Sequence, residues 1–192
     1  MTNLKLETSI SDPLAEEVGR LRAEIARLEN RITDLDRLAH HDSLVPLLNR
    51  RGFFRQLEKL IDRTERYGDG GAVLFVDVDG LKLLNDSFGH HAGDAALIHL
   101  ARLLLGGVRQ SDCVARFGGD EFAILLERVT EAEASETAAR LADLIAGTEF
   151  SHDGHTIPLS AAIGIAAIEK GDRAEQVLIR ADRAMYEEKA AA

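Results

Sequence analysis

One stretch of this sequence combines the residue types that metal-dependent chemistry needs. In the segment 116–122, two glycines and two adjacent carboxylates separate two apolar runs that favour strands. Gly118-Gly119 between such runs predicts a two-residue hairpin turn, whose glycines accept positive φ and let a ligand approach the backbone. Asp120 and Glu121 then place oxygen donors at the mouth of the turn, as a hard divalent cation requires. An ordinary hairpin with solvated acidic residues fits the same pattern, so this stretch alone leaves both interpretations open.

A second acidic site lies upstream, where a core strand is expected to end. Residues 72–76 are continuously apolar, as expected of a strand covered on both faces, and Asp77 follows them directly. If this strand lies beside the hairpin, Asp77 meets Asp120 and Glu121, and three carboxylates so close together repel each other unless a cation neutralises them. The sequence therefore predicts a metal site. Asp79 has the simpler alternative role of capping the helix that follows.

The apolar periodicity predicts the elements that position these carboxylates. Helices are expected at 51–66, 93–108, 130–146 and 173–189, and strands at 72–77, on both sides of the Gly-Gly turn and within 156–168. From residue 72 onward, the order strand, helix, strand, strand, helix, strand is that of the split βαβ, ferredoxin-like architecture. We therefore expect an α/β fold of the α+β type, with a central sheet that contains antiparallel strands and is flanked by helices.

The N-terminal part of the chain carries a heptad pattern. Apolar residues alternate at spacings of four and three, with leucine at d and β-branched residues at a: Leu14, Val18, Leu21, Ile25, Leu28, Ile32 and Leu35. This combination favours a parallel two-stranded coiled coil. An amphipathic helix folded back on its own domain is the alternative. The expected organisation is a flexible N-terminus at 1–13, a dimeric coiled coil at 14–39 and a globular domain at 40–192.

Composition argues against several classes of function. The formal net charge of −10 disfavours a surface for nucleic acid or anionic membrane, because either needs a basic stripe. Cys113 is the only cysteine, so the chain can form no internal disulfide and no cysteine-rich metal site. The N-terminus lacks the pattern of a signal peptide, and no apolar run is long enough to span a bilayer. We therefore expect a cytoplasmic protein.

Five spaced motifs resemble those of the GGDEF family, the diguanylate cyclases of bacterial signalling. In family order they are 42–51 (D-x-L-T-x-L-x-N-R-R), 77–86 (D-x-D-x-F-K-x-x-N-D), 89–94 (G-H-x-x-G-D), the signature 118–122, and 181–189 (A-D-x-A-[LM]-Y-x-A-K). The resemblance implies a nucleotidyl-cyclase palm fold. It also implies condensation of two GTP molecules to cyclic di-GMP and two pyrophosphates, with each subunit of a homodimer presenting one GTP to the other.

The resemblance also assigns the residues of a two-metal reaction. Asp77 and Glu121 are implied to coordinate two Mg²⁺ or Mn²⁺ ions per active site, assisted by the carbonyl of Val78 and the side chain of Asp120. Such in-line phosphoryl transfer needs no protein nucleophile. Lys82, in the loop or first helical turn after the strand, is expected to support catalysis by holding phosphate oxygens.

Further positions are implied to bind the substrate. Asn85 and Asp94 would read the guanine edge, because a carboxylate accepts hydrogen bonds from the guanine amine and ring N–H. Lys189 would join the upstream lysine in holding the β- and γ-phosphates. Gly118 and Gly119 are expected to border the bound nucleotide.

A short motif upstream of the glycines matches the family's product-inhibition site. Arg109 and Asp112 have the spacing R-x-x-D, and an arginine can bind guanine O6 and N7 with two hydrogen bonds. Cyclic di-GMP would then be both product and inhibitor. The alternative is that the arginine balances a helix dipole and the aspartate opens the next turn.

The sequence departs from the family pattern at a few packing positions. Val45, Pro46 and Leu81 replace the usual residues, with little expected effect.

Two other functions are alternatives to a diguanylate cyclase. They are a non-catalytic receptor for GTP or cyclic di-GMP and a nucleotidyl cyclase of another specificity. The intact metal carboxylates argue against the first, and the guanine-reading positions argue against the second. A regulatory protein bound to the coil is a possible partner.

Overall fold

The computed structural model describes the backbone of residues 4–191 and the side chains of residues 13–190. Contacts within the chain divide it into two compact units, Met1–Ala39 and His40–Ala192. Within the described residues, no helix combines the length and the apolarity needed to cross a lipid bilayer.

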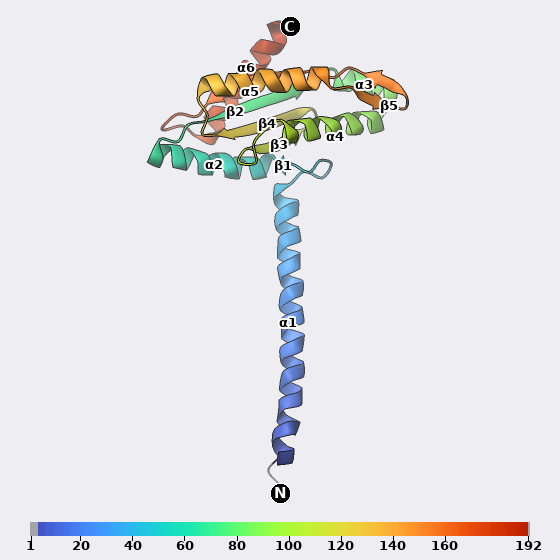
Figure 1. Ribbon diagram of the computed structural model, residues 1–192, viewed down its shortest axis with the longest axis vertical. Coiled ribbons are helices and arrows are strands. Elements are labelled where there is room, and N and C mark those ends of the chain that lie inside the picture. Colours follow the sequence, from blue (N-terminus) through green and yellow to red (C-terminus); the bar gives the residue numbers. More distant parts are fainter. Residues whose placement is uncertain (1–3, 192) are drawn as a thin grey trace. The chain divides into compact units, whose positions relative to one another are not determined.

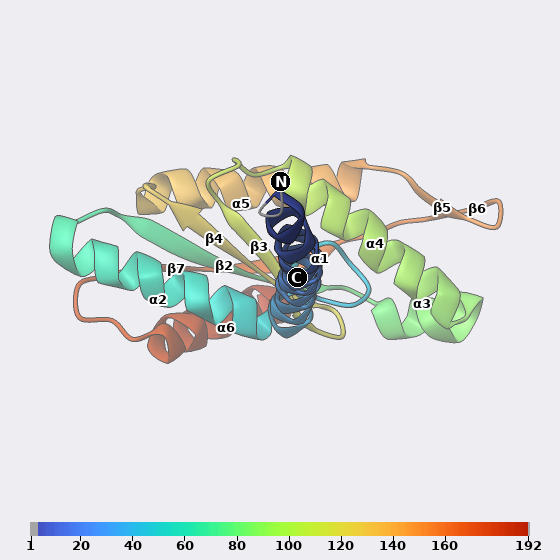
Figure 2. The same ribbon diagram turned by 90° about the horizontal axis from the view of Figure 1, so that it is seen from below.

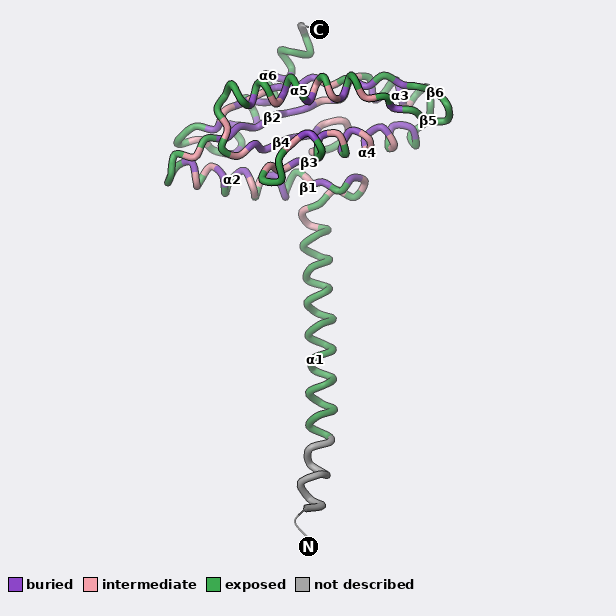
Figure 3. Tube along the Cα trace, viewed as in Figure 1, coloured by how far each residue is buried: buried purple, intermediate pink, exposed green. Residues whose placement is uncertain are grey.

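The first unit is a single long helix, α1 (Leu4–His40) (Figure 1). It begins at Leu4, within the segment 1–13 for which the sequence predicts a flexible N-terminus: residues 4–13, including Pro13, belong to the helix, and residues 1–3 lie outside the described residues. Most residues of this stretch are compatible with a helix, and leucine, lysine and glutamate favour one. From residue 13 to 38 the helix is exposed throughout (Figure 3). Its heptad positions are therefore bare in the single chain, for example Ile25 at 55% exposure and Ile32 at 66%.

The second unit is built on a five-stranded sheet of order β1-β3-β4-β2-β7. The strands are β1 (Leu48–Asn49), β2 (Gly71–Val78), β3 (Cys113–Gly118), β4 (Glu121–Glu127) and β7 (Ala161–Ala167). The short β1 pairs parallel with β3, and all other neighbours are antiparallel. The order β3-β4-β2-β7 is that of the split βαβ architecture, so the expected fold is confirmed.

Helices cover both faces of this sheet. They are α2 (Arg50–Tyr67), α3 (Leu81–Phe88), α4 (His90–Gly106), α5 (Glu131–Gly147) and α6 (Ala174–Ala191). Figure 2 shows α2 and α6 along one side of the sheet and α4 and α5 along the other. Each face has its own apolar core, one formed with α3, α4 and α5 and the other with α2 and α6.

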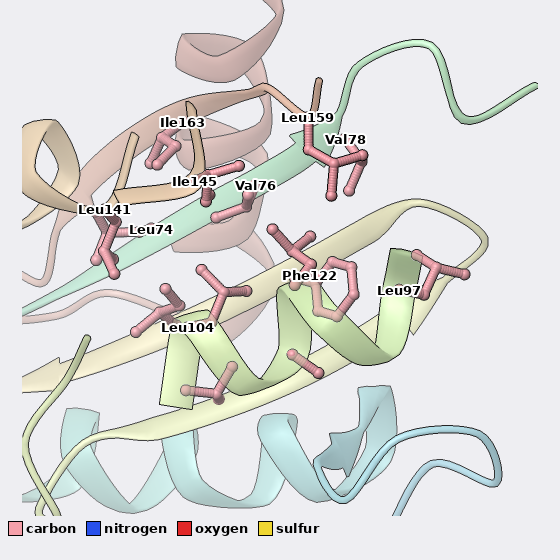
Figure 4. Packing of buried hydrophobic residues seen from close by; sticks show 14 of the residues in the cluster. Leu74, Val76, Val78, Leu97, Leu104, Phe122, Leu141, Ile145, Leu159 and Ile163 are labelled. Atoms are coloured by element: carbon pink, nitrogen blue, oxygen red, sulfur yellow. The ribbon is translucent and has the colours of Figure 1, made fainter. Parts of the chain in front are cut away.

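Strand β2 contributes to both cores, which explains its continuous apolar sequence. Leu74 and Val76 belong to the core under α4 and α5 (Figure 4), whereas Val73 and Phe75 belong to the core under α2 and α6. All four side chains are at most 5% exposed. The strand is thus held from both sides up to the point where its acidic end begins.

The region expected as one β-prone run at 156–168 is two separate strands. A hairpin of β5 (Phe150–His152) and β6 (His155–Ile157) precedes β7, and Pro158 follows β6 directly. Proline supplies no backbone N–H for a sheet, so it separates the two strands. The hairpin turns at Asp153 and Gly154, both with positive φ (48° and 78°), which is the conformation that Asp-Gly turns favour.

Candidate active site

Asp77 and Glu121 lie directly opposite each other at the ends of adjacent strands. They are register partners in the antiparallel pair β2 and β4, so the strand does lie beside the hairpin as the sequence predicts. The backbone N–H of Val78 donates to the carbonyl of Asp120 at 3.1 Å, which ties the turn to the end of β2. The side chain of Asp77 is 16% exposed. Three carboxylate residues therefore meet at one edge of the sheet.

The turn itself is displaced by one residue from the prediction. Gly118 pairs with Glu121, so Gly119 and Asp120 form the turn rather than Gly118 and Gly119. The register shifts between Arg116 and Gly118, and this bulge moves the turn along the chain. Asp120 consequently stands within the turn and not on a strand.

Gly118 at the end of β3 and Gly119 in the turn adopt conformations that other residues avoid. Gly118 has φ 151° and Gly119 has φ 52°. Arg116 holds the turn by donating from Nη2 and Nε to the carbonyl of Gly119, at 2.8 and 3.1 Å. Apart from the glycine itself and its two chain neighbours, no described residue has an atom within 4 Å of a Cβ placed on either glycine. The backbone is therefore open to a ligand.

Asp77, Asp120 and Glu121, at the neighbouring ends of β2 and β4, form what we call the acidic edge. Its negative charge is only partly neutralised by other side chains. Burial is the main reason that the pKa of Glu121 is raised, and the carboxylates of Asp120, Asp77 and Asp182 raise it further. Lys189 of α6 donates to Asp77 Oδ1, and its Nζ lies 3.8 Å from Asp79 Oδ1. The contact with Asp77 is the main cause of the raised pKa of Lys189.

These observations test whether the edge suits a divalent cation. The donors are carboxylate oxygens, which Mg²⁺ and Mn²⁺ prefer, and the raised pKa of Glu121 reflects negative charge that a cation would relieve. The ammonium group of Lys189 already neutralises the negative charge of Asp77 that a metal ion would otherwise neutralise. Within residues 13–190, no three carboxylate, imidazole or thiol groups stand in a complete metal-binding arrangement. The residues fit in donor type and charge, and metal binding requires some rearrangement of side chains.

Asp79 is held by a residue that gave no local sequence signal. Ser160, just before β7, donates from Oγ to Asp79 Oδ2 at 2.7 Å, and the Ser160 carbonyl accepts from the Asp79 N–H at 2.9 Å. Both contacts join residues that are distant in the chain. Asp79 is thereby fixed at the start of α3, where it does not cap the helix: the N-cap is Gly80, which makes no side-chain cap.

The candidate guanine-binding residues gather where α3 meets α4. The side chain of Asn85 lies against Gly93, where a Cβ would stand 2.0 Å from Asn85 Oδ1. This oxygen is buried and has no hydrogen-bond partner within the described residues. Asp94 follows Gly93 and is exposed, as is Lys82 in the first turn of α3. An unsatisfied acceptor beside an exposed carboxylate suits a polar ligand edge.

Arg109 and Asp112 lie at the opposite end of the sheet from the acidic edge. Asp112 Oδ1 accepts from the N–H of Glu127, the last residue of β4, whereas Glu121 is its first. Asp112 Oδ2 accepts from the Arg109 N–H at 2.9 Å, so the aspartate stabilises the turn between α4 and β3. The Arg109 side chain is exposed. The structure thus separates this motif from the metal-site candidates.

Two charged residues near Glu121 received no role from the sequence. Arg50 and Asp182 line a cavity of about 240 Å³ together with Glu121, Phe117 and three apolar residues of β2 and α6. The Arg50 guanidinium lies 5.7 Å from the Phe117 ring centroid and lowers the pKa of Glu121, opposing Asp182. Arg50 lies in the first family-like motif (42–51) and Asp182 in the last (181–189). These motifs were the only sequence signal that could have identified the two residues.

The chain matches known proteins along most of its length. Residues 39–192 match the family model described as diguanylate cyclase, GGDEF domain. The bifunctional diguanylate cyclase/cyclic di-GMP phosphodiesterase MucR of Pseudomonas aeruginosa is 40% identical over 157 residues, which are 81% of this chain and 23% of MucR. Diguanylate cyclase TpbB of the same species is 40% identical over 182 residues, which are 90% of this chain and 41% of TpbB. The chain thus spans less than half the length of these relatives.

Solved structures agree with this match. The GGDEF domain of TpbB superimposes with a TM-score of 0.76 at 40% identity, covering 80% of this chain and 90% of that one. The coiled coil and GGDEF domain of DgcB from Caulobacter crescentus, solved with cyclic di-GMP, gives a TM-score of 0.88 at 24% identity, covering 93% and 95%. Sequence motifs, sheet order and these comparisons agree, and the chain belongs to the GGDEF family.

Proposed function

We propose that this chain is a diguanylate cyclase that condenses two GTP molecules to cyclic di-GMP and two pyrophosphates. The observation that carries the proposal is the pairing of Asp77 with Glu121 across β2 and β4, next to Asp120 in an open glycine turn. A receptor that only binds nucleotide has no need for these clustered carboxylates, which raise each other's energy. Relatives named as diguanylate cyclases support the same activity.

Asp77 and Glu121 would hold two Mg²⁺ or Mn²⁺ ions, with Asp120 and the carbonyl of Val78 assisting. Bound metal would lower the pKa of the ribose 3′-hydroxyl and stabilise charge on the α-phosphate and the leaving pyrophosphate. Lys189 lies beside Asp77. When the Asp77 carboxylate binds metal, the ammonium group of Lys189 can move away from it and bind phosphate oxygens instead. The exposed Lys82 supplies a second positive charge from α3, and the open turn lets the phosphates approach the backbone.

Asn85 and Asp94 would select guanine. Asp94 can accept from the guanine amine and ring N–H, which adenine cannot offer in the same arrangement. The unsatisfied Oδ1 of Asn85 would gain a partner on ligand binding.

The product's symmetry explains why two subunits are needed. Cyclic di-GMP contains two identical phosphodiester bonds, so two identical half-sites related by a two-fold axis would each supply one GTP. The exposed heptad stripe of α1 supports dimerisation through a parallel coiled coil. The coil is also where a regulatory partner protein would act.

Arg109 and Asp112 would form an inhibitory site for cyclic di-GMP. The exposed guanidinium can bind the guanine O6 and N7, and the ordered turn presents it at a fixed position. Its place at the far end of β4 from Glu121 means that product bound there does not compete directly for the metal carboxylates.

The test is direct assay of the product. Purified protein is incubated with GTP and Mg²⁺, and cyclic di-GMP is quantified by chromatography. We expect turnover by the natural sequence and a loss of about 100-fold or more in Glu121→Gln, which keeps the side-chain shape but removes the charge. Glu136→Gln, at an exposed position on α5, is the matched control and should retain activity. If the natural sequence binds nucleotide but forms no cyclic di-GMP, the result would favour the receptor.

A further inference from the structure

Helix α6 approaches strand β7 without any side chain between them at one point. A Cβ on Gly164 of β7 would lie 2.0 Å from the backbone nitrogen of Met185 and 2.2 Å from the carbonyl oxygen of Ala181. Only glycine fits such a contact. The helix is therefore seated directly on the strand, and its position along β7 is fixed by backbone contact.

A second contact fixes the same helix one turn further on. Glu188 Oε2 accepts from the backbone N–H of Ile163 at 2.8 Å. Strand β7 is at the edge of the sheet and pairs only with β2, so this N–H points away from the sheet and needs a partner from elsewhere. The corresponding position of the family motif seen in 181–189 is alanine, which cannot make this bond.

The residue that follows Glu188 reaches the acidic edge. Lys189 contacts Asp77 and lies 3.8 Å from Asp79, although its long side chain is 40% exposed and has several rotatable bonds. Glu188 and Lys189 are consecutive residues, so the contact of Glu188 with β7 anchors the helical turn from which the Lys189 side chain extends. A tether in this turn therefore determines how often Lys189 is in place.

We infer that Glu188 is a positioning residue: its hydrogen bond to β7 holds the last turn of α6 so that Lys189 meets the triphosphate of GTP. This inference rests on the proposed function, because it assigns Lys189 to the phosphates. In this role Glu188 would contact neither substrate nor metal, because its carboxylate binds the backbone of β7. Its effect is on the probability that the ammonium group is correctly placed, and hence on substrate affinity.

The neighbouring residue provides a matched control. Glu187 pairs with Arg183 on α6 itself, at 2.9 Å, and its side chain is 66% exposed. Glu187→Ala removes the same charge from the same helical turn and leaves the contact with Ile163 intact. Glu188→Gln keeps an oxygen that can accept from Ile163, whereas Glu188→Ala keeps none.

The experiment compares the full chain with Glu188→Ala, Glu188→Gln and Glu187→Ala. Isothermal titration with guanosine 5′-(α,β-methylene)triphosphate and Mg²⁺ measures affinity without turnover, since the bond to be broken is replaced. We expect Glu188→Ala to raise Kd, and KM for GTP, by about three- to tenfold with kcat changed by less than about twofold, as for lost ground-state binding. Glu188→Gln and Glu187→Ala should stay close to the natural sequence.

Further results distinguish a wrong positioning role for Glu188 from a wrong proposed function. Amide exchange of Ile163 should accelerate in Glu188→Ala alone, which verifies that the tether exists in solution. Equal affinity of all four proteins for the analogue would overturn the positioning role while leaving the proposed function intact. An equal loss of affinity in Glu187→Ala would show that removal of a negative charge, and not loss of the contact with Ile163, weakens binding. That result would also overturn the positioning role. Failure of all four to bind the analogue would overturn the proposed function together with this inference.

Discussion

At the scale of single residues, the acidic edge is a place where charge destabilises the fold. Glu121 is partly buried and faces Asp77 across the strand pair, with Asp120 beside it. Arg50 and Lys189 oppose these charges, and in the proposed reaction Lys189 must also bind the phosphates. The proposed function accounts for this charge, because a divalent cation is attracted most strongly where carboxylates repel each other.

The raised pKa of Glu121 predicts how stability depends on pH in the absence of metal. A carboxyl group whose pKa is raised on folding binds its proton more tightly in the folded state, so its contribution to stability decreases as pH rises above its ordinary value of 4.5 and levels off above the raised value. We expect Glu121→Gln to match the natural sequence below this window and to be more stable above it. Urea denaturation from pH 4 to 8 in EDTA measures this difference. A constant difference across the range would contradict it.

Asn85 should also lower the stability of the fold while contributing to GTP binding. Its Oδ1 is buried without a partner among the described residues, which is unfavourable by about 1–3 kcal/mol. We expect Asn85→Ala to leave the free energy of unfolding unchanged or to raise it by about 1 kcal/mol, while weakening GTP binding. Chemical denaturation and titration with the non-reacting GTP analogue measure the two effects. A strongly destabilised variant would show that the amide has structural partners.

At the scale of elements, the sequence predicts what depends on local periodicity. The apolar run at 72–76 is β2, and it is apolar throughout because Val73 and Phe75 face one core and Leu74 and Val76 the other. The order of elements also predicts the sheet order, because a split βαβ arrangement fixes which strands are neighbours. The predicted meeting of Asp77 with the hairpin follows from that order.

Features that depend on long-range contacts or on backbone irregularity could not be predicted in this way. The bulge after Arg116 displaces the turn by one residue, and no periodicity signals it. Ser160 is 81 residues from Asp79 in the chain, and they meet only because β7 pairs with β2 in the folded sheet. The β5–β6 hairpin is a different case, since Asp153-Gly154 is a recognisable turn signal that the broader β-prone run obscured.

The backbone contact between β7 and α6 predicts an unusually sensitive glycine. The Cβ of Gly164→Ala would overlap backbone atoms of Met185 and Ala181, which cannot move away without shifting α6. We expect a loss of about 2–3 kcal/mol or more in unfolding free energy, measured by urea denaturation. Gly147→Ala at the end of α5 should be nearly neutral, because beyond the adjacent helix backbone no described residue lies within 4 Å of the new Cβ. Similar effects of the two substitutions would show that α6 is loosely seated.

At the scale of the whole molecule, the two units differ in what stabilises them. The two apolar cores are made entirely of residues between Val45 and Met185, so the second unit has the means to fold alone. The described part of α1 contributes to neither core and leaves its apolar stripe exposed. An isolated helix with such a stripe gains most of its stability from a partner helix. Helix α1 and the second unit should therefore respond separately to mutation.

A single charge in the coil seam tests this separation. Ile25 is an a position and is 55% exposed in the single chain, so in a parallel dimer Ile25→Asp would bring two carboxylates together in an apolar seam. Asn30→Asp adds the same charge at the outward f position of the same heptad and is the control. By analytical ultracentrifugation, we expect Ile25→Asp to shift the protein towards monomer and Asn30→Asp to leave the dimer intact.

The consequence for activity follows from mass action. If each half-site holds one GTP, cyclic di-GMP can form only in the dimer, so specific activity becomes dependent on protein concentration once the coil is weakened. Ile25→Asp, like deletion of residues 1–39, should therefore lose activity at low protein concentration and recover part of it at high concentration. The thermal unfolding of the second unit should not change, because its cores lie outside α1. Activity that stays independent of concentration in a demonstrably monomeric variant would contradict catalysis across two half-sites, since one subunit would then suffice for both bonds of the product.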